Sequence, residues 1–208
     1  SATDVFVRDR LAGTTVRVSV SASGAQLAAA SRRPEISGNG LRIVFDSFGA
    51  PLPDSGFNNC YLVDRATGGV ILLDRRVDTG AAANGTCQSP SISVDGNRVA
   101  FASPTPFLAP GDADTNGWAD VFVRDLAAAS TVRINRGPGG IEANAPADQL
   151  RISAFGSHVI YSSLASNLVP DDSNAGRDVF VADLGGQTRR VSVGSGNVQA
   201  NGTVVSEA

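Results

Sequence analysis

Residues 112–120 combine oxygen-bearing side chains at a spacing that suits a hard divalent cation. Aspartate or asparagine stands at the first, third, fifth and ninth positions, glycine at the sixth, and the seventh residue offers its backbone carbonyl. Calcium takes about six to eight oxygen ligands from loops of this composition. The sequence therefore predicts a Ca²⁺ site with ligands from Asp112, Asp114, Asn116, Trp118 and Asp120.

The same loop also allows a purely structural interpretation. Val123 stands where an EF-hand would have its bidentate glutamate. Aspartate, asparagine and glycine are ordinary loop formers, and Asp120 opens an apolar segment just as Asp4 and Asp178 do. Weaker versions of the pattern occur at residues 172–178 and at Asp54 and Asn58.

The chain has two cysteines, Cys60 and Cys87. A disulfide between them would join neighbouring repeat units and imply an oxidising compartment. The alternative is two unpaired small apolar side chains, since the sequence does not show whether the two Cα atoms lie close enough for a bridge.

The sequence supplies no set of residues for nucleophilic catalysis. His158 is the single histidine, and no serine-elbow motif accompanies it. Zinc would lack ligands for the same reason. We assign no catalytic residue and favour a non-enzymatic protein.

Two motifs recur along the chain. The first is a polar residue, an apolar segment and an aspartate, followed by a turn and a second β-rich run; it occupies residues 4–9, 59–64, 120–125 and 178–183. The second begins with Ile-Ser and ends with an aromatic residue, at 36–45, 92–101 and 152–161. Asn39-Gly40 and Asp95-Gly96 predict two-residue type I′ hairpin turns, with positive φ at both residues.

Each repeat unit therefore contains two hairpins, or four strands. The segments of the motifs are apolar on both faces, as expected of a sheet covered on both sides. A tandem array of four-stranded antiparallel sheets predicts an all-β fold of β-propeller blades.

The motifs Ile-Ser-x-Asp-Gly-x-x-Val-Ala-Phe and Asp-Val-Phe-Val-x-Asp resemble the WD40-like (PD40), TolB-type propeller repeats of bacteria. The resemblance covers nearly the whole chain and implies that the Ile-Ser strand is innermost in each blade. Asn59 and Cys60 depart from the first motif, and Phe155 precedes Gly156 where the second motif has aspartate.

The repeats predict an outer hairpin followed by three complete blades. We expect the hairpin at residues 1–22, blades at 23–78, 79–138 and 139–196, and the start of another blade at 197–208. Either the chain is a fragment of a larger propeller, or its ends and partner molecules complete the ring, including self-association through the incomplete blade. We favour the fragment.

Composition limits the classes of partner. The net charge of −3 is evenly scattered, whereas nucleic-acid binding requires a clustered basic patch. No apolar segment is long enough to span a bilayer, and all basic residues are arginine, which fits a GC-rich bacterial source. We expect the mature part of a secreted, periplasmic or cell-envelope protein.

Two functions remain open from the sequence. The first is a non-catalytic, extracytoplasmic binding or scaffold module for a protein, peptide or glycan. The alternative is the substrate-gating propeller of a larger hydrolase, such as a prolyl-oligopeptidase-like serine peptidase. A third reading, calcium-assisted polysaccharide lysis, would need a base and a basic cluster that the sequence does not supply recognisably.

Overall fold

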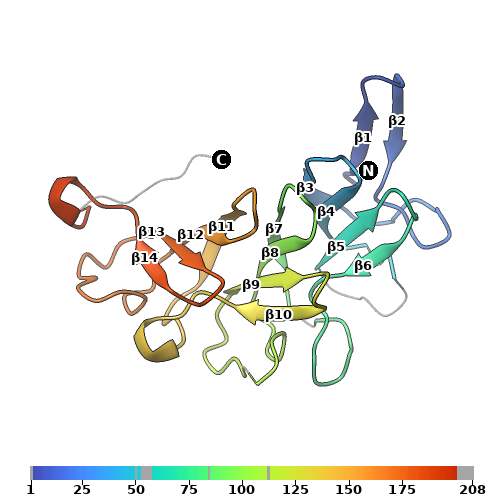
Figure 1. Ribbon diagram of the computed structural model, residues 1–208. Helices are drawn as coiled ribbons and strands as arrows, with labels where there is room; N and C mark the ends of the chain where they lie inside the picture. The colour runs from blue at the N-terminus through green and yellow to red at the C-terminus, as the bar shows by residue number, and fades with distance from the viewer. Residues whose placement is uncertain (1, 50, 53–57, 84, 112, 201–208) are drawn as a thin grey trace.

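The computed structural model describes residues 2–49, 51–52, 58–83, 85–111 and 113–200. In this part of the chain the strands form three four-stranded antiparallel sheets and one two-stranded hairpin. Figure 1 shows them side by side in an arc, with the hairpin at one end and the last sheet at the other. The predicted all-β fold of propeller blades is confirmed.

The hairpin pairs β1 (Phe6–Asp9) with β2 (Thr14–Arg17). Sheet one contains β3 (Ser31–Ile36), β4 (Arg42–Ser47), β5 (Asn59–Asp64) and β6 (Val70–Leu72). Sheet two contains β7 (Gln88–Ile92), β8 (Arg98–Ser103), β9 (Asp120–Asp125) and β10 (Ser130–Arg133). Sheet three contains β11 (Ala147–Ile152), β12 (His158–Ser163), β13 (Asp178–Asp183) and β14 (Thr188–Arg190). Two short 3-10 turns are present in the described residues: η1 (Pro138–Gly140) lies between β10 and β11, and η2 (Ser195–Asn197) follows β14.

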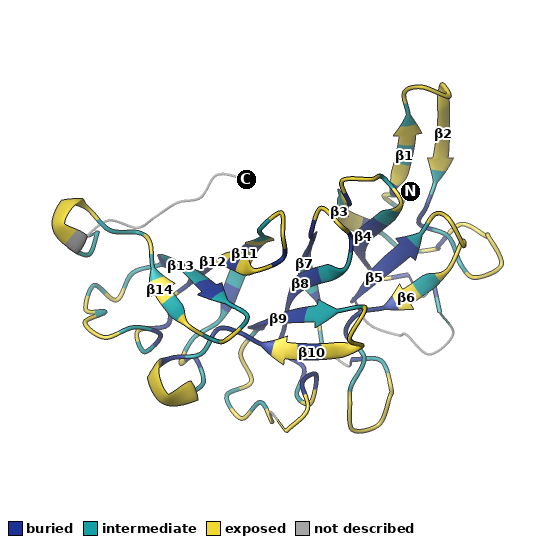
Figure 2. Cartoon of the chain, in the orientation of Figure 1, coloured by how far each residue is buried: buried dark blue, intermediate teal, exposed yellow. Residues whose placement is uncertain are grey.

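The hydrophobic cores lie between the sheets. On β4, Val44 faces sheet two, while Ile43 and Phe45 face the β1–β2 hairpin. Successive residues of a strand point to opposite faces, so a strand that is apolar at every position must be covered on both sides. Figure 2 accordingly shows the middle strands β4, β5, β8 and β9 largely buried.

An aromatic pair joins the second and third strands of every complete sheet. The ring centroids lie 6.0 Å apart for Phe45 and Tyr61, 5.9 Å for Phe101 and Phe122, and 5.8 Å for Tyr161 and Phe180. Each pair consists of residues directly opposite in the register. Such pairs stabilise beyond the area that they bury.

The predicted type I′ turns are wrong. Gly40 and Gly96 have φ of 71° and 76°, but Asn39 and Asp95 are absent from the residues with positive φ. The side chains of these two residues instead accept hydrogen bonds from backbone N–H groups two residues further on, at 3.0 Å in both cases. The loop is longer than two residues, so only the glycine needs the left-handed conformation.

A disulfide joins Cys60 on β5 to Cys87 just before β7, with the Cα atoms 5.5 Å apart. Both residues belong to the core between sheets one and two. The bond therefore links two neighbouring blades covalently.

Replacing both cysteines tests this link. We expect C60A/C87A to lose roughly 2–4 kcal/mol of stability, or about 5–15 °C in melting temperature for a domain of this size. Thermal unfolding followed by circular dichroism gives the shift. Alkylation of the denatured wild-type protein without reductant should leave both thiols unmodified; complete alkylation would contradict the bond.

Candidate functional site

The predicted metal loop leads into a buried carboxylate. Asp120, the first residue of β9, is fully buried. Its Oδ1 accepts a hydrogen bond from Asn135 Nδ2 at 2.6 Å, and its Oδ2 accepts one from Arg133 Nη1 at 2.5 Å. Antiparallel pairing of β9 with β10 brings Arg133 and Asn135 to this point.

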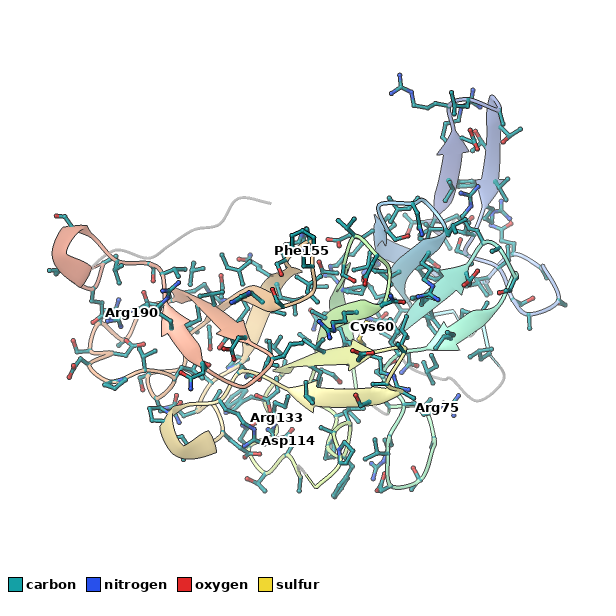
Figure 3. The ribbon with its side chains drawn as sticks, viewed as in Figure 1. Cys60, Arg75, Asp114, Arg133, Phe155 and Arg190 are labelled. Atoms are coloured by element: carbon teal, nitrogen blue, oxygen red, sulfur yellow. A yellow bond between two sulfur atoms is a disulfide. The ribbon has the colours of Figure 1, made fainter. Side chains whose placement is uncertain are left out.

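Arg133 contacts two further acids (Figure 3). Its Nη2 donates to Glu142 Oε1 at 2.7 Å, and its Nη1 lies 3.9 Å from Asp114 Oδ1. The Arg133 side chain is only 1% exposed. Burial raises the pKa of Asp120 to about 6, although Arg133 acts in the opposite direction. A guanidinium stays charged when buried, so it supplies a fixed positive charge among the three carboxylates.

The loop before β9 is held to this cluster. Thr115 Oγ1 donates to Glu142 Oε2 at 2.6 Å, and Asn116 Nδ2 donates to Ala143 O at 2.9 Å. Asp114 Oδ1 accepts from Asn116 N at 3.0 Å, which is an ordinary side-chain-capped turn. Trp118 is 47% exposed.

The structure thus brings two of the predicted calcium ligands, Asp114 and Asp120, to one guanidinium. Asn116 and Trp118 serve the turn, while Asp112 lies outside the described residues. Among the residues described, no three acidic, histidine or cysteine side chains form a group that could hold a metal ion. A Ca²⁺ ion using Asp120 would have to displace Arg133, and calcium at this loop stays a prediction.

The same polar cluster recurs in other repeat units. In sheet three, Asp178 lies 3.7 Å from Arg190 and accepts from Gln199 at 3.2 Å. Asp172 lies 3.4 Å from Arg190, so it corresponds to Asp114. In the hairpin the equivalents are Asp4, Arg17 and Gln26. Sequence reasoning missed this cluster, although an Asp, an Arg and a Gln or Glu recur at nearly constant offsets.

In sheet one the carboxylate and the asparagine of the cluster change places. Asn59 occupies the position of Asp120, and Asp74 the position of Asn135, with Asn59 Nδ2 donating to Asp74 Oδ2 at 2.8 Å. Leu72 stands in the arginine position, so Asp74 has no equivalent of Arg133. Burial raises the pKa of Asp74 to about 7.

Each inner strand contains a β-bulge with a strained residue. Arg33, Ser89 and Gln149 have φ of 49°, 52° and 49°, at the register shifts in β3, β7 and β11. Positive φ costs energy for a residue with a Cβ. Bulges commonly redirect side chains at binding sites, so these inner edges are candidate contact positions.

The turn between β11 and β12 exposes an aromatic ring. Phe155 occupies the turn position of Asn39 and Asp95 and is 88% exposed (Figure 3). The adjacent Gly156 lies against the Arg98 side chain of sheet two. His158 is exposed at the start of β12, and its Nδ1 lies 2.9 Å from Ser157 Oγ.

Neither the protein-family models nor the curated proteins give a match. Among solved structures, TolB from Acinetobacter baumannii matches with a TM-score of 0.51 and 20% identity, covering 96% of this chain and 40% of that one. A putative TolB from Agrobacterium tumefaciens matches with a TM-score of 0.54 and 14% identity, covering 88% and 52%. The tricorn protease matches with a TM-score of 0.52 and 15% identity, covering 88% and 16%.

The fold is that of a TolB-type β-propeller. The chain spans 40% and 52% of the two TolB chains. At these identities the likeness concerns architecture alone. Within the described residues, no helix is long and apolar enough to cross a membrane.

Asp74 should make stability fall as pH rises. Its pKa of about 7 in the folded protein exceeds the unfolded value. Between about pH 4 and pH 7 Asp74 therefore ionises only in the unfolded state, and this ionisation lowers the free energy of unfolding. We expect the melting temperature of D74N, relative to wild type, to rise by roughly 5 °C from pH 5 to pH 8. Asp78, an exposed carboxylate with a lowered pKa, provides the control D78N. Parallel curves for D74N and wild type would contradict the assignment.

Calcium titration of chelator-treated protein tests the predicted metal loop. A Ca²⁺ ion bound to the native state raises the melting temperature, and no shift at millimolar calcium contradicts the site.

We expect R133L, which introduces the residue that sheet one has at this position, to melt several degrees lower than wild type because three carboxylates lose their cation. Calcium should recover part of that loss. Equal calcium responses in R133L and wild type would show that the guanidinium does not occupy the cation position.

Proposed function

We propose that this protein is a non-catalytic, extracytoplasmic β-propeller that binds a protein, peptide or glycan partner, with the β11–β12 turn in the contact surface. The observation that carries the proposal is the exposed Phe155. A large apolar side chain in a tight turn contributes little to the fold when its ring lies in water. Aromatic residues are enriched among the strongest contributors to binding.

The comparison with the other blades shows what Phe155 replaces. Asn39 and Asp95 stabilise their turns by accepting backbone N–H groups and a serine hydroxyl. Phenylalanine has no such acceptor, so in sheet three the N–H of Ser157 donates to Ser153 Oγ instead, at 3.2 Å. A local departure from a repeated stabilising residue supports a role in binding.

The Cys60–Cys87 disulfide supports the proposed compartment. Disulfides persist in secreted and periplasmic proteins and are rare in a reducing cytosol. The bond lies in the core between two blades, so it links two parts of the folded protein.

The gating propeller of a larger hydrolase stays the alternative prediction. The likeness to the tricorn protease, at 15% identity and 16% of that chain, concerns architecture alone. A hydrolase domain in the same polypeptide would favour this alternative.

Replacing Phe155 with the residue that sheet two has at this position tests the proposal. We expect F155D to be at least as stable as wild type, because aspartate restores the turn acceptors. Ligands selected on wild-type protein from a phage-displayed peptide library and an oligosaccharide array should bind F155D at least ten times more weakly. Biolayer interferometry measures both affinities.

Leu11 offers a matched control, since it is fully exposed at the β1–β2 turn. L11D should retain the wild-type affinity. Unchanged binding by F155D, or no ligand from either library, would contradict the proposal.

A further inference from the structure

A cavity of about 360 Å³ lies between sheets two and three, beside their outermost strands. Its lining consists of residues 136–140, Leu168, Pro170 and residues 185–188. The η1 turn thus forms one wall and the β13–β14 turn the other, and Thr188 Oγ1 joins them by donating to Arg136 O at 2.9 Å. Ligand sites have volumes of roughly 300–1,000 Å³, so this cavity suits a small molecule.

A missing side chain on the η1 turn helps to open this space. Gly137 occupies the position that Arg76 has between sheets one and two. The N–H of each donates across its own loop, to Ile141 O and to Ala81 O, at 2.9 Å in both cases. The Arg76 guanidinium lies over the Phe107 ring at 5.0 Å, whereas Gly137 has no side chain to place there.

Strand β13 has a smaller residue facing the same space. Ala182 lies opposite Thr188 in the register, just as Arg124 lies opposite Thr131 in sheet two. Arg124 Nη1 donates to Thr131 Oγ1 at 3.2 Å. Alanine cannot donate in this way, and Thr188 instead donates to Arg136 O on the facing wall.

The glycines of the lining differ in whether the backbone requires them. Gly137 is required, because a Cβ there would lie 2.2 Å from Asn167 O. Gly185 is absent from the residues with positive φ, and its Cβ would meet only the Asp183 side chain, at 3.2 Å. Ala127 is the equivalent residue of the β9–β10 turn, counted from the aspartate that ends the third strand. An open space that the backbone does not require supports a binding role.

The lining combines a cation with apolar surface. Among the described residues that form it, Arg136 is the charged one, and Pro138, Leu168 and Pro170 are apolar. Arg136 Nη1 donates to Gly140 O. A guanidinium has five N–H donors in a planar fork that matches a carboxylate. The cavity therefore favours an anion with an apolar body over a cation.

We infer that this cavity binds a small monocarboxylate with a compact apolar body. The carboxylate accepts N–H groups of Arg136, and the apolar body lies against Leu168 and the two prolines. Phe155 lies elsewhere, in the turn between the first and second strands of sheet three. The inference therefore goes beyond the proposed function and does not depend on it.

Sodium benzoate is a probe with both features. Titration into the full chain, followed by ¹H–¹⁵N NMR, should shift the amide resonances of glycines 139–140 and 185–186. We expect a dissociation constant on the order of 1 mM, because so small a ligand makes few contacts. Benzamide lacks the charge and acetate lacks the apolar body, so each should bind at least ten times more weakly. Equal affinity for benzoate and either of these controls overturns the inference.

Gly185→Leu tests the place of binding. The leucine side chain fills the cavity and should weaken benzoate binding at least tenfold. Ala127→Leu, at the equivalent place in the β9–β10 turn, is the matched control and should retain the wild-type affinity. F155D should retain it as well, which separates this site from the proposed partner surface. Circular dichroism checks that each variant is folded.

Two results overturn the inference. One is equal benzoate affinity of G185L and wild type. The other is the absence of any shift of the four glycine resonances in wild-type protein at benzoate concentrations well above the expected dissociation constant, a readout that does not depend on the folding of a variant.

Discussion

Burial of both faces of the middle strands in sheets one and two is the constraint on which this structure depends. Val44 and Ile43 are neighbours on β4, yet they belong to two different cores. Covering both faces of such a sheet keeps its apolar layers out of water. The aromatic pairs fix the second and third strands, while the cores on each side fix the order of the blades.

Polar side chains fix the starts of the third strands and the segments that connect them to the rest of the structure. A carboxylate at the start of the third strand, or its exchanged partner in sheet one, ties that strand to the segment after the fourth strand and to the loop leading into the next blade. Because Asp120 and Arg133 are buried together, loss of one partner exposes the other to the full cost of an unpaired buried charge. Sheet one avoids the arginine and has a neutral asparagine facing Asp74 instead.

Departures from the repeat mark the places where this protein differs from a plain array of blades. Phe155 replaces a turn-stabilising residue, and Phe6 remains exposed where its equivalents are covered. Both residues are large and apolar, but they stand in different surroundings. Phe155 lies in a turn, which suits a ligand surface, whereas Phe6 lies on β1, which pairs with β2 in the described sheets.

The sequence by itself determined the blade repeats, their order and the inner hairpins, because periodic motifs report local strand pairing directly. It left the cysteines open, mistook the turn type at Asn39 and Asp95, and did not reveal that Arg133 lies against Asp114 and Asp120. Only the tertiary structure decided these points. Whether two cysteines meet, or whether a guanidinium or a metal ion neutralises a carboxylate, depends on side chains brought together from different strands and blades.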